Sequence, residues 1–134
     1  MRMEAEMKER RRVSTGVPWA KVVGYSRAVR VDDRIWVSGT AAVAPQGGIA
    51  HPGDPYLQAR RCIEIIAAAL EEVGADLSHV VRTRMFVRHP DHWEAVGRAH
   101  GEAFGEVMPA TTMVFTGFID PDMLVEIEAE AVAQ

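Results

Sequence analysis

Residues 124–132 restrict the fold more than any other segment, because apolar and acidic side chains alternate strictly from Val125 to Ala131. Successive side chains of a β-strand point to opposite faces of its sheet. One face of this strand is therefore apolar and the other carries carboxylates: Val125, Ile127, Ala129 and Ala131 against Glu126, Glu128 and Glu130. The pattern predicts a sheet that is covered on one face only.

A second strand, over residues 79–88, has the complementary charge. Val81, Thr83, Met85 and Val87 are expected on one face, and Arg82, Arg84, Phe86 and Arg88 on the other. Charges on such a face are ordinarily buried by pairing across subunit interfaces. We therefore expect most of these arginines, with Arg27 and Arg30, to pair there with Glu126, Glu128 and Glu130.

Two helices are predicted between the strands. The first has Asp54 as its N-cap and Pro55 at its first position, and it ends at Gly74. Its apolar stripe is Cys62, Ile66, Ala69, Leu70 and Val73. The second begins after Pro90 with Asp91 and Glu94 as a capping pair. One side of it is lined by Trp93, Val96, Gly97, His100 and Phe104, and we expect Gly97 to let this helix approach the sheet closely.

The remaining segments predict turns and loops. Residues 27–31 and 34–38 alternate around Asp32 and Asp33 as a β-hairpin, whereas residues 44–55 form a loop. Residues 112–118 and 124–132 are expected to form a second hairpin, turned by Asp120, Pro121 and Asp122. The order hairpin, helix, strand, helix, hairpin predicts an α+β fold. Two helices cover one face of a mostly antiparallel or mixed sheet of about six strands, and the Arg- and Glu-rich face stays open.

Composition sets the class of protein. The chain has 134 residues, a net charge of −4 and a single cysteine, which fits one domain over residues 1–134 with a charged N-terminal arm at about 1–12. No signal peptide or spanning segment is recognisable, so we expect a cytoplasmic protein. The acidic balance argues against a nucleic-acid partner, and the basic run 8–12 is interpreted as a solvated arm or an edge strand.

Neither the cysteine nor the histidines predict a cofactor. Cys62 lies among isoleucines and is interpreted as a buried apolar residue. His89, Asp91 and His92 are possible ligand types, but Pro90 bends the chain, Asp91 is needed as a cap, and no further ligand cluster accompanies them. We therefore expect no metal and no cofactor. His100 lies on the apolar side of its helix and is expected to be a satisfied core histidine.

Six segments, in order and spacing, resemble the YjgF/RidA family over roughly residues 16–132. They are Gly24-Tyr25-Ser26-Arg27-Ala28-Val29, Trp36-Val37-Ser38-Gly39-Thr40, Gln58, Val80-Val81-Arg82-Thr83-Arg84-Met85-Phe86-Val87, Pro109-Ala110-Thr111-Thr112, and Val125-Glu126-Ile127-Glu128-Ala129. The resemblance implies a chorismate-mutase-like fold, a homotrimer and pockets between subunits. Family deaminases hydrolyse 2-imino acids to 2-keto acids and ammonia, which requires a cation for the carboxylate and a carboxyl group for the water.

Carried over to this chain, the resemblance makes Glu126 the water-orienting carboxylate. Tyr25, Ser38 and Gly39 become pocket residues, and the segment Thr111, Thr112 and Met113 becomes part of the substrate site. Thr111 replaces the family's arginine, Met113 its cysteine and Gly97 its asparagine, so the usual carboxylate clamp is missing. Arg84 or Arg27 is the candidate for the lost positive charge.

Three functions follow from this pattern. The first is a trimer that binds a small polar metabolite between subunits and hydrolyses an imine or enamine other than the usual 2-imino acid. The second is a non-catalytic trimer that senses a metabolite or a partner. The third, ribonuclease activity, ranks last because the sequence shows no basic, aromatic groove and no histidine pair suited to phosphodiester cleavage.

Overall fold

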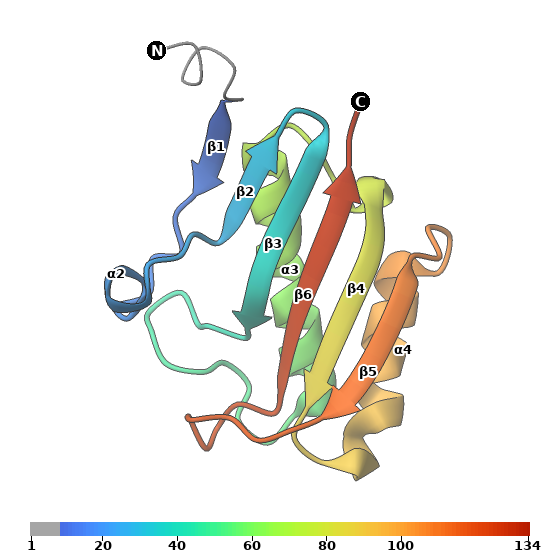
Figure 1. Cartoon of the computed structure of the whole chain (residues 1–134). Helices are drawn as coiled ribbons and strands as arrows, with labels where there is room; N and C mark the ends of the chain where they lie inside the picture. Colours follow the sequence, from blue (N-terminus) through green and yellow to red (C-terminus); the bar gives the residue numbers. More distant parts are fainter. Residues whose placement is uncertain (1–8) are drawn as a thin grey trace.

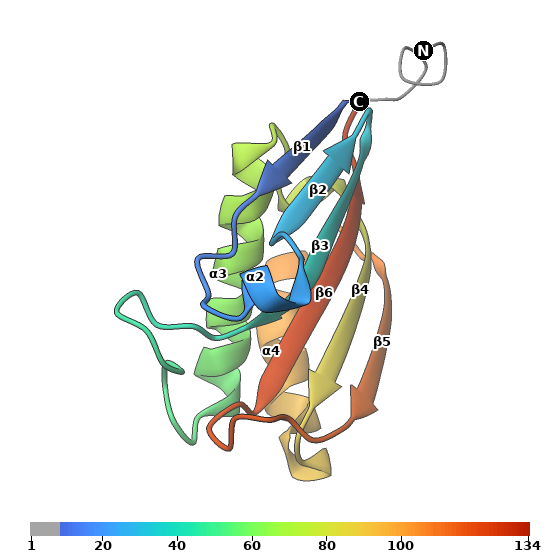
Figure 2. The same ribbon diagram turned by 60° about the vertical axis from the view of Figure 1, so that its left-hand side comes forward.

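The protein, in a computed structural model that describes residues 9–134, is a six-stranded sheet with two long helices on one face (Figures 1 and 2). The strand order is β1-β2-β3-β6-β4-β5, and only β4 and β5 are parallel neighbours. The strands are β1 (Arg10–Val13), β2 (Ala28–Val31), β3 (Arg34–Ala41), β4 (Val80–Val87), β5 (Ala110–Phe115) and β6 (Val125–Val132). The long helices are α3 (Pro55–Glu72) and α4 (Trp93–Phe104). Within the described residues three short helices complete the set: α2 (Ala20–Val23) before β2, η1 (Leu77–His79) before β4 and η2 (Pro90–His92) before α4. The predicted α+β class is confirmed.

Helix α3 begins and ends where local signals place it. The Asp54 side chain accepts a hydrogen bond from the Leu57 amide at 2.9 Å, and Pro55 occupies the first helical position. Gly74 follows the helix with φ of 80°, a left-handed conformation that glycine adopts without strain. The predicted apolar stripe is buried at every position. This stripe therefore fixes which face of α3 lies on the sheet.

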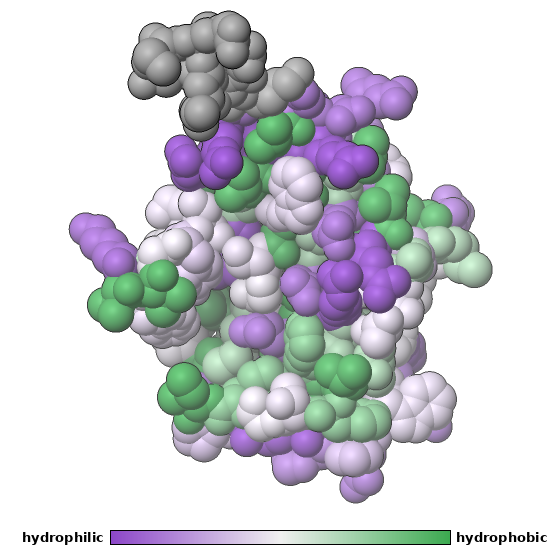
Figure 3. Space-filling model, viewed as in Figure 1, coloured by the Kyte–Doolittle hydropathy of each residue, from purple (hydrophilic) through white to green (hydrophobic). Residues whose placement is uncertain are grey.

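The alternation in β6 is also as expected. Its apolar side chains are buried against the helices, and its glutamates are half-buried on the opposite, open face. Figure 3 shows hydrophilic side chains gathered over the middle of that face, with apolar ones beside them. Of the basic run, Arg10–Val13 form the edge strand β1, while residues 1–8 lie outside the described part.

The predicted C-terminal hairpin is wrong. Strand β4 lies between β5 and β6, so these two strands do not pair, and β5 instead runs parallel to β4. The long connection between β5 and β6 is held by Arg88, whose Nε donates to the Met123 carbonyl and whose Nη2 donates to the Asp120 carbonyl, both at 2.7 Å. Its guanidinium also lies 5.3 Å from the Phe118 ring centre. The turn at Asp120 thus belongs to the connection that passes β4 between β5 and β6, and not to a hairpin.

Three details of β4 and α4 also differ from expectation. The register shifts between Val80 and Arg82, so Val81 turns outward and is 49% exposed. Helix α4 starts after η2 with no side-chain cap, and Trp93 is 55% exposed. A Cβ added at Gly97 would meet nothing within 4 Å. Gly97 therefore borders open space, and contrary to expectation it does not serve to bring α4 close to the sheet.

Most of the arginines expected to pair across subunit interfaces already have partners within the chain, while pairing between subunits stays a prediction. Arg84 pairs within its own chain, with Glu130 at 3.0 Å and Glu128 at 4.0 Å. Arg27, Arg30 and Arg88 instead donate to backbone carbonyl oxygens. Most of the arginine side chains in question therefore organise the chain's own loops and strand ends.

None of the helices in residues 9–134 is both long and apolar enough to cross a membrane.

Candidate functional site

Glu126 lies in the middle of the sheet against a glycine. It is opposite Ala41 of β3 and Phe86 of β4, and its carboxyl group extends over Gly39. A Cβ added at Gly39 would lie 2.6 Å from Glu126 Oε1 and 2.9 Å from its carboxyl carbon. No residue with a side chain fits there without moving the carboxyl group. Gly39 therefore fixes the position of the Glu126 carboxyl group.

The backbone under Glu126 is an irregular part of β3, and Arg27 holds it. The register of β3 against β6 shifts between Val37 and Thr40, and Gly39 lies in this irregular stretch. Arg27, only 6% exposed, donates from Nη1 to the Gly39 carbonyl at 2.8 Å and to Thr40 Oγ1 at 3.0 Å. Thr40 Oγ1 in turn donates to the Ser38 carbonyl at 2.7 Å. The buried guanidinium thus fixes the strand that faces Glu126.

The surroundings of Glu126 favour its protonated form. Burial raises the pKa of the Glu126 carboxyl above its ordinary value, Arg27 lowers it in part, and Glu128 adds to the rise. Within the described part of the chain no basic side chain lies in ion-pair distance of Glu126. The group is therefore a half-buried carboxyl with a nearby positive charge that does not neutralise it by direct contact.

Ser38 and Tyr25 flank this arrangement, but their polar atoms already have partners. Ser38 Oγ donates to the Ser26 carbonyl at 2.7 Å, and the Tyr25 hydroxyl accepts from Trp19 Nε1 at 2.9 Å. Tyr25 lines a shallow surface depression beside α2 together with Ser26 and Lys21. The two side chains thus continue the Glu126 region along the ends of β2 and β3.

A second group of polar residues lies at the other margin of the sheet. Thr111 of β5 is paired with Thr83 of β4, and their hydroxyl groups are hydrogen-bonded to each other. Thr83 Oγ1 is also 2.8 Å from His100 Nε2 of α4. Burial lowers the pKa of His100, which is 9% exposed, so this ring is neutral at physiological pH. Met113 is two residues along the same side of β5 and packs against the core.

Thr112 and Arg84 belong to the open face. Thr112 Oγ1 accepts a hydrogen bond from Arg82 at 3.0 Å, and Arg84 pairs with Glu128 and Glu130. The residues suggested by the resemblance therefore fall into separate groups of one chain. Ser38, Gly39 and Glu126 lie together on β3 and β6, with Arg27 and Tyr25 just before β2, whereas Thr111, Thr112 and Met113 lie on β5 beyond β4.

Sequence reasoning found Glu126 but not how Arg27 and His100 contribute. Arg27 was a candidate for a substrate clamp, but its guanidinium is bonded to the backbone of β3. His100 is a satisfied core histidine, as expected, but its partner, Thr83, links it to Thr111. The parallel register of β4 and β5 creates this link, and no local pattern in the sequence signals it.

Cys62 and the metal-ligand residue types give no sign of a second centre. Burial strongly raises the pKa of the Cys62 thiol, and the residue is fully enclosed, as an apolar core residue would be. Over residues 9–134 no three or more histidine, cysteine, aspartate or glutamate side chains are grouped to hold a metal ion.

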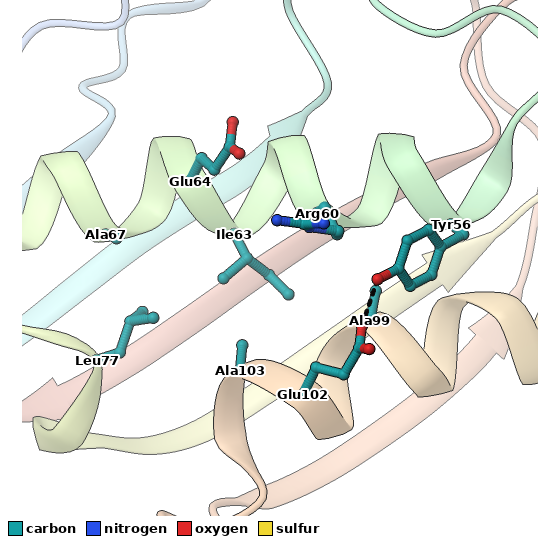
Figure 4. Close-up of a pocket in the computed structure, with 9 residues that line it drawn as sticks. All are labelled: Tyr56, Arg60, Ile63, Glu64, Ala67, Leu77, Ala99, Glu102 and Ala103. Carbon is teal, nitrogen blue, oxygen red and sulfur yellow. Dashed lines mark hydrogen bonds between the residues drawn. The ribbon is translucent and has the colours of Figure 1, made fainter.

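A groove between α3 and α4 lies away from these residues. Figure 4 shows Tyr56 pointing toward Glu102, with the hydroxyl donating to the carboxylate at 2.5 Å, and Ile63 and Ala103 lining the floor. Arg98 lies 4.4 Å from the Tyr56 ring centre. The groove belongs to the helical side of the molecule and contains none of the candidate site residues.

Known proteins resemble the chain over nearly its whole length. Residues 17–133 match the model of the family described as Endoribonuclease L-PSP. An uncharacterized protein of Streptomyces coelicolor is 42% identical over 123 residues, covering 90% of each chain. The 3-aminoacrylate deaminase RutC of Acinetobacter baylyi is 31% identical over 107 residues, covering 80% of this chain and 85% of that protein.

A crystal structure agrees with these sequence matches. A member of the YjgF family from Mycobacterium tuberculosis superposes with a TM-score of 0.83 and 40% identity, covering 93% of this chain and all of the other. The six-stranded sheet, the two covering helices and the sequence match therefore point to one origin, and the chain belongs to the YjgF/RidA family, also described as Endoribonuclease L-PSP.

Proposed function

We propose that the protein is a homotrimer whose clefts between subunits bind a small polar metabolite, an imine or an enamine, and hydrolyse it. The observation that carries this proposal is the Glu126 carboxyl group, half-buried, with a raised pKa, and held against Gly39. A carboxylate with a raised pKa is a better proton acceptor near neutral pH than an exposed one. The similarity to a 3-aminoacrylate deaminase supports the same class of reaction.

The chemistry needs one water and one carboxylate. Glu126 accepts a proton from the water as the water oxygen bonds to the imine carbon. Glu126 returns this proton to the imine nitrogen, which gives a carbinolamine. The hydroxyl proton of the carbinolamine then moves through Glu126 to the amine nitrogen, the carbon–nitrogen bond breaks as the carbonyl forms, and a carbonyl compound and ammonia result. An enamine first takes a proton at carbon and then follows the same route. Arg27 contributes by fixing β3 and by limiting the rise in the pKa of Glu126.

The usual 2-imino acid is a poor match to this site. Thr111 is neutral and cannot provide the two-pronged contact of a guanidinium with a carboxylate. Arg84 is engaged by Glu128 and Glu130, and Arg27 by backbone and hydroxyl oxygens. Each arginine is engaged through Nη1, so a carboxylate bound by either of them would compete with these partners, and we infer that the substrate lacks a carboxylate at this end.

The assembly is part of the proposal. Glu126 and Thr111 lie on strands separated by β4, and their side chains extend to opposite faces of the sheet. One ligand touches both groups only if a second copy of the chain supplies one of them. Mixed trimers test this: Glu126→Gln subunits, which should be inactive alone, and Thr111→Arg subunits, which should bind the carboxylate-free substrate poorly, should together regain activity at low substrate concentration when unfolded together and refolded. No regain beyond the separately refolded variants would argue against a shared cleft.

Turnover is tested with imines made in the assay. An amine oxidase supplies imines without a carboxylate, an amino-acid oxidase supplies 2-imino acids, and imine decay is followed with and without the protein. We expect faster decay of the carboxylate-free imine only. Glu126→Gln should abolish it, while Glu128→Gln, the matched change on the same strand, should retain most of it. If neither imine decays faster although a ligand still binds, the hydrolase hypothesis fails and the protein is a non-catalytic binding trimer.

A further inference from the structure

A line of hydrogen-bonded side chains runs from the protein core to the exposed edge of the sheet. It begins at His100 of α4, passes through the buried Thr83 hydroxyl of β4, and ends at Thr111 on β5. Thr111 is exposed and β5 is the outer strand of the sheet. The Thr111 hydroxyl is therefore the one member of this line that a ligand can reach.

The state of the His100 ring decides what the Thr111 hydroxyl presents. A hydroxyl donates one hydrogen bond and accepts two, and a neutral imidazole donates from one nitrogen and accepts at the other. If Nε2 accepts from Thr83, Thr83 accepts from Thr111, and the Thr111 lone pairs face outward. If Nε2 carries the proton, it donates to Thr83, and the Thr83 hydroxyl donates to Thr111. The Thr111 proton is then directed either to the Thr83 carbonyl, 3.3 Å away, or to a ligand. Thr111 thus offers a donor or an acceptor but no charge.

Gly97 leaves open space on the side of α4 that carries His100. Gly97 precedes His100 by three residues and so shares its side of α4, and a Cβ added there would meet nothing within 4 Å. Met113 follows Thr111 by two residues on the same side of β5. On this side of β5 and α4 the chain thus places a hydroxyl, a thioether and an imidazole, and Gly97 adds no side chain. The guanidinium of Arg82 is bonded to Thr112, whose side chain lies on the opposite face.

We propose that Thr111, positioned by His100 through Thr83, binds an uncharged polar group of the ligand, such as a carboxamide, a ketone or a hydroxyl. This inference rests on the proposed function and names the substrate class of its cleft. An uncharged group of this kind gives and accepts single hydrogen bonds, which matches a hydroxyl of either polarity. A carboxylate only accepts, and it would lose its water without gaining an opposite charge.

Pyruvamide and pyruvate, which differ only in this group, are suitable probes for the assembled protein. We expect isothermal titration to give an affinity for pyruvamide about tenfold above that for pyruvate, a ratio within the range for one hydrogen bond. Thr111→Val, which keeps the shape and removes the hydroxyl, should abolish the preference, and Thr111→Ser should retain it. Thr111→Arg should reverse it. Equal or inverted wild-type affinities would overturn the inference yet leave the cleft intact.

The positioning role of His100 needs a measurement that fold stability alone does not change. We expect the ¹⁵N shifts of the ring nitrogens to report a single neutral tautomer and to change on addition of pyruvamide, but not of pyruvate. His100→Gln, which keeps a hydrogen-bonding group near Nε2, should preserve the amide preference, and His100→Leu should lose it. Thr83→Val breaks the same line without touching the histidine and should act as His100→Leu does.

The outcomes separate the two levels of the proposal. If Thr83→Val keeps the wild-type preference, Thr111 acts alone and the positioning role of His100 is refuted. If neither probe binds the wild-type protein and both leave the signals of Glu126 and Thr111 unchanged, the proposed metabolite cleft itself fails, and the substrate class fails with it.

Discussion

Gly39→Ala tests the contact on which the candidate site depends. The new Cβ would lie 2.6 Å from Glu126 Oε1, and an ordinary contact begins at about 3.4 Å. The carboxyl group must therefore move by about 0.8 Å or rotate away, because the other partner is backbone. The Glu126 side chain is flexible, so an off-rotamer position costs only about 1 kcal/mol. A displacement of this size in a catalytic group lowers turnover by about a hundredfold.

The expected signature is a large functional loss with a small change in stability. A crystal structure of the variant should show the Glu126 carboxyl displaced, and denaturant unfolding should show a free-energy change of about 1 kcal/mol or less. Hydrolysis of carboxylate-free imines should fall by about two orders of magnitude. Gly101→Ala in α4 is the matched control, because an added Cβ there meets nothing within 4 Å. It should stabilise α4 by about 0.5–1 kcal/mol and leave Glu126 in place.

Two results would refute this reasoning. An unmoved carboxyl group in Gly39→Ala would mean that the backbone of β3 yields instead, despite the bonds from Arg27. A displaced carboxyl group with unchanged turnover would mean that the position of Glu126 is irrelevant to hydrolysis. The first outcome removes the structural role of Gly39, and the second removes the catalytic role of Glu126.

Further predictions concern the buried ionisable groups. The folded-state pKa of Glu126 is raised, so its contribution to stability is present below its unfolded pKa and is lost as pH rises through the folded value. Glu126→Gln should therefore be more stable than the wild type near neutral pH, with the gain vanishing in acid unfolding titrations. His100 has a lowered pKa, so stability is present above its unfolded value and lost as pH falls through the folded one. His100→Gln should remove that acid-dependent loss. Arg27→Met should cost about 1–3 kcal/mol in denaturant unfolding, because the Gly39 carbonyl and the Thr40 hydroxyl lose their donor. The exposed Arg98→Met should cost about 0.5 kcal/mol or less.

Elements with local signals were predicted well. Asp54, Pro55 and Gly74 mark the limits of α3 by capping chemistry that depends only on nearby residues. The alternation in β6 needs no partner to be recognised, and the hairpin around Asp32 is set by a short turn. These features are encoded within a few residues of the sequence, so reading them requires no knowledge of the fold.

Elements whose position depends on distant strands were not predicted. The connection between β5 and β6 has turn residues at Asp120, yet β4 lies between the two strands because β5 pairs with it in parallel. The outward turn of Val81 follows from a register shift against β6. Helix α4 has acidic residues where caps are expected, but η2 precedes it and leaves them unused. The first two errors arise from pairing between segments far apart in the sequence, whereas the third is local, because η2 occupies the residues at which α4 was expected to begin.

The same distinction applies to the candidate site. Glu126 is visible in the sequence as part of a family pattern, whereas the line from His100 to Thr111 exists only because β4 and β5 are parallel and in a particular register. The inner pair, His100 and Thr83, is hydrogen-bonded directly, without an atom of residue 111 between them. An exposed edge position above an already satisfied pair can change its side chain with little effect on folding. Under the proposed function, position 111 therefore sets the charge of the preferred ligand, and Glu126 with Gly39 sets the reaction.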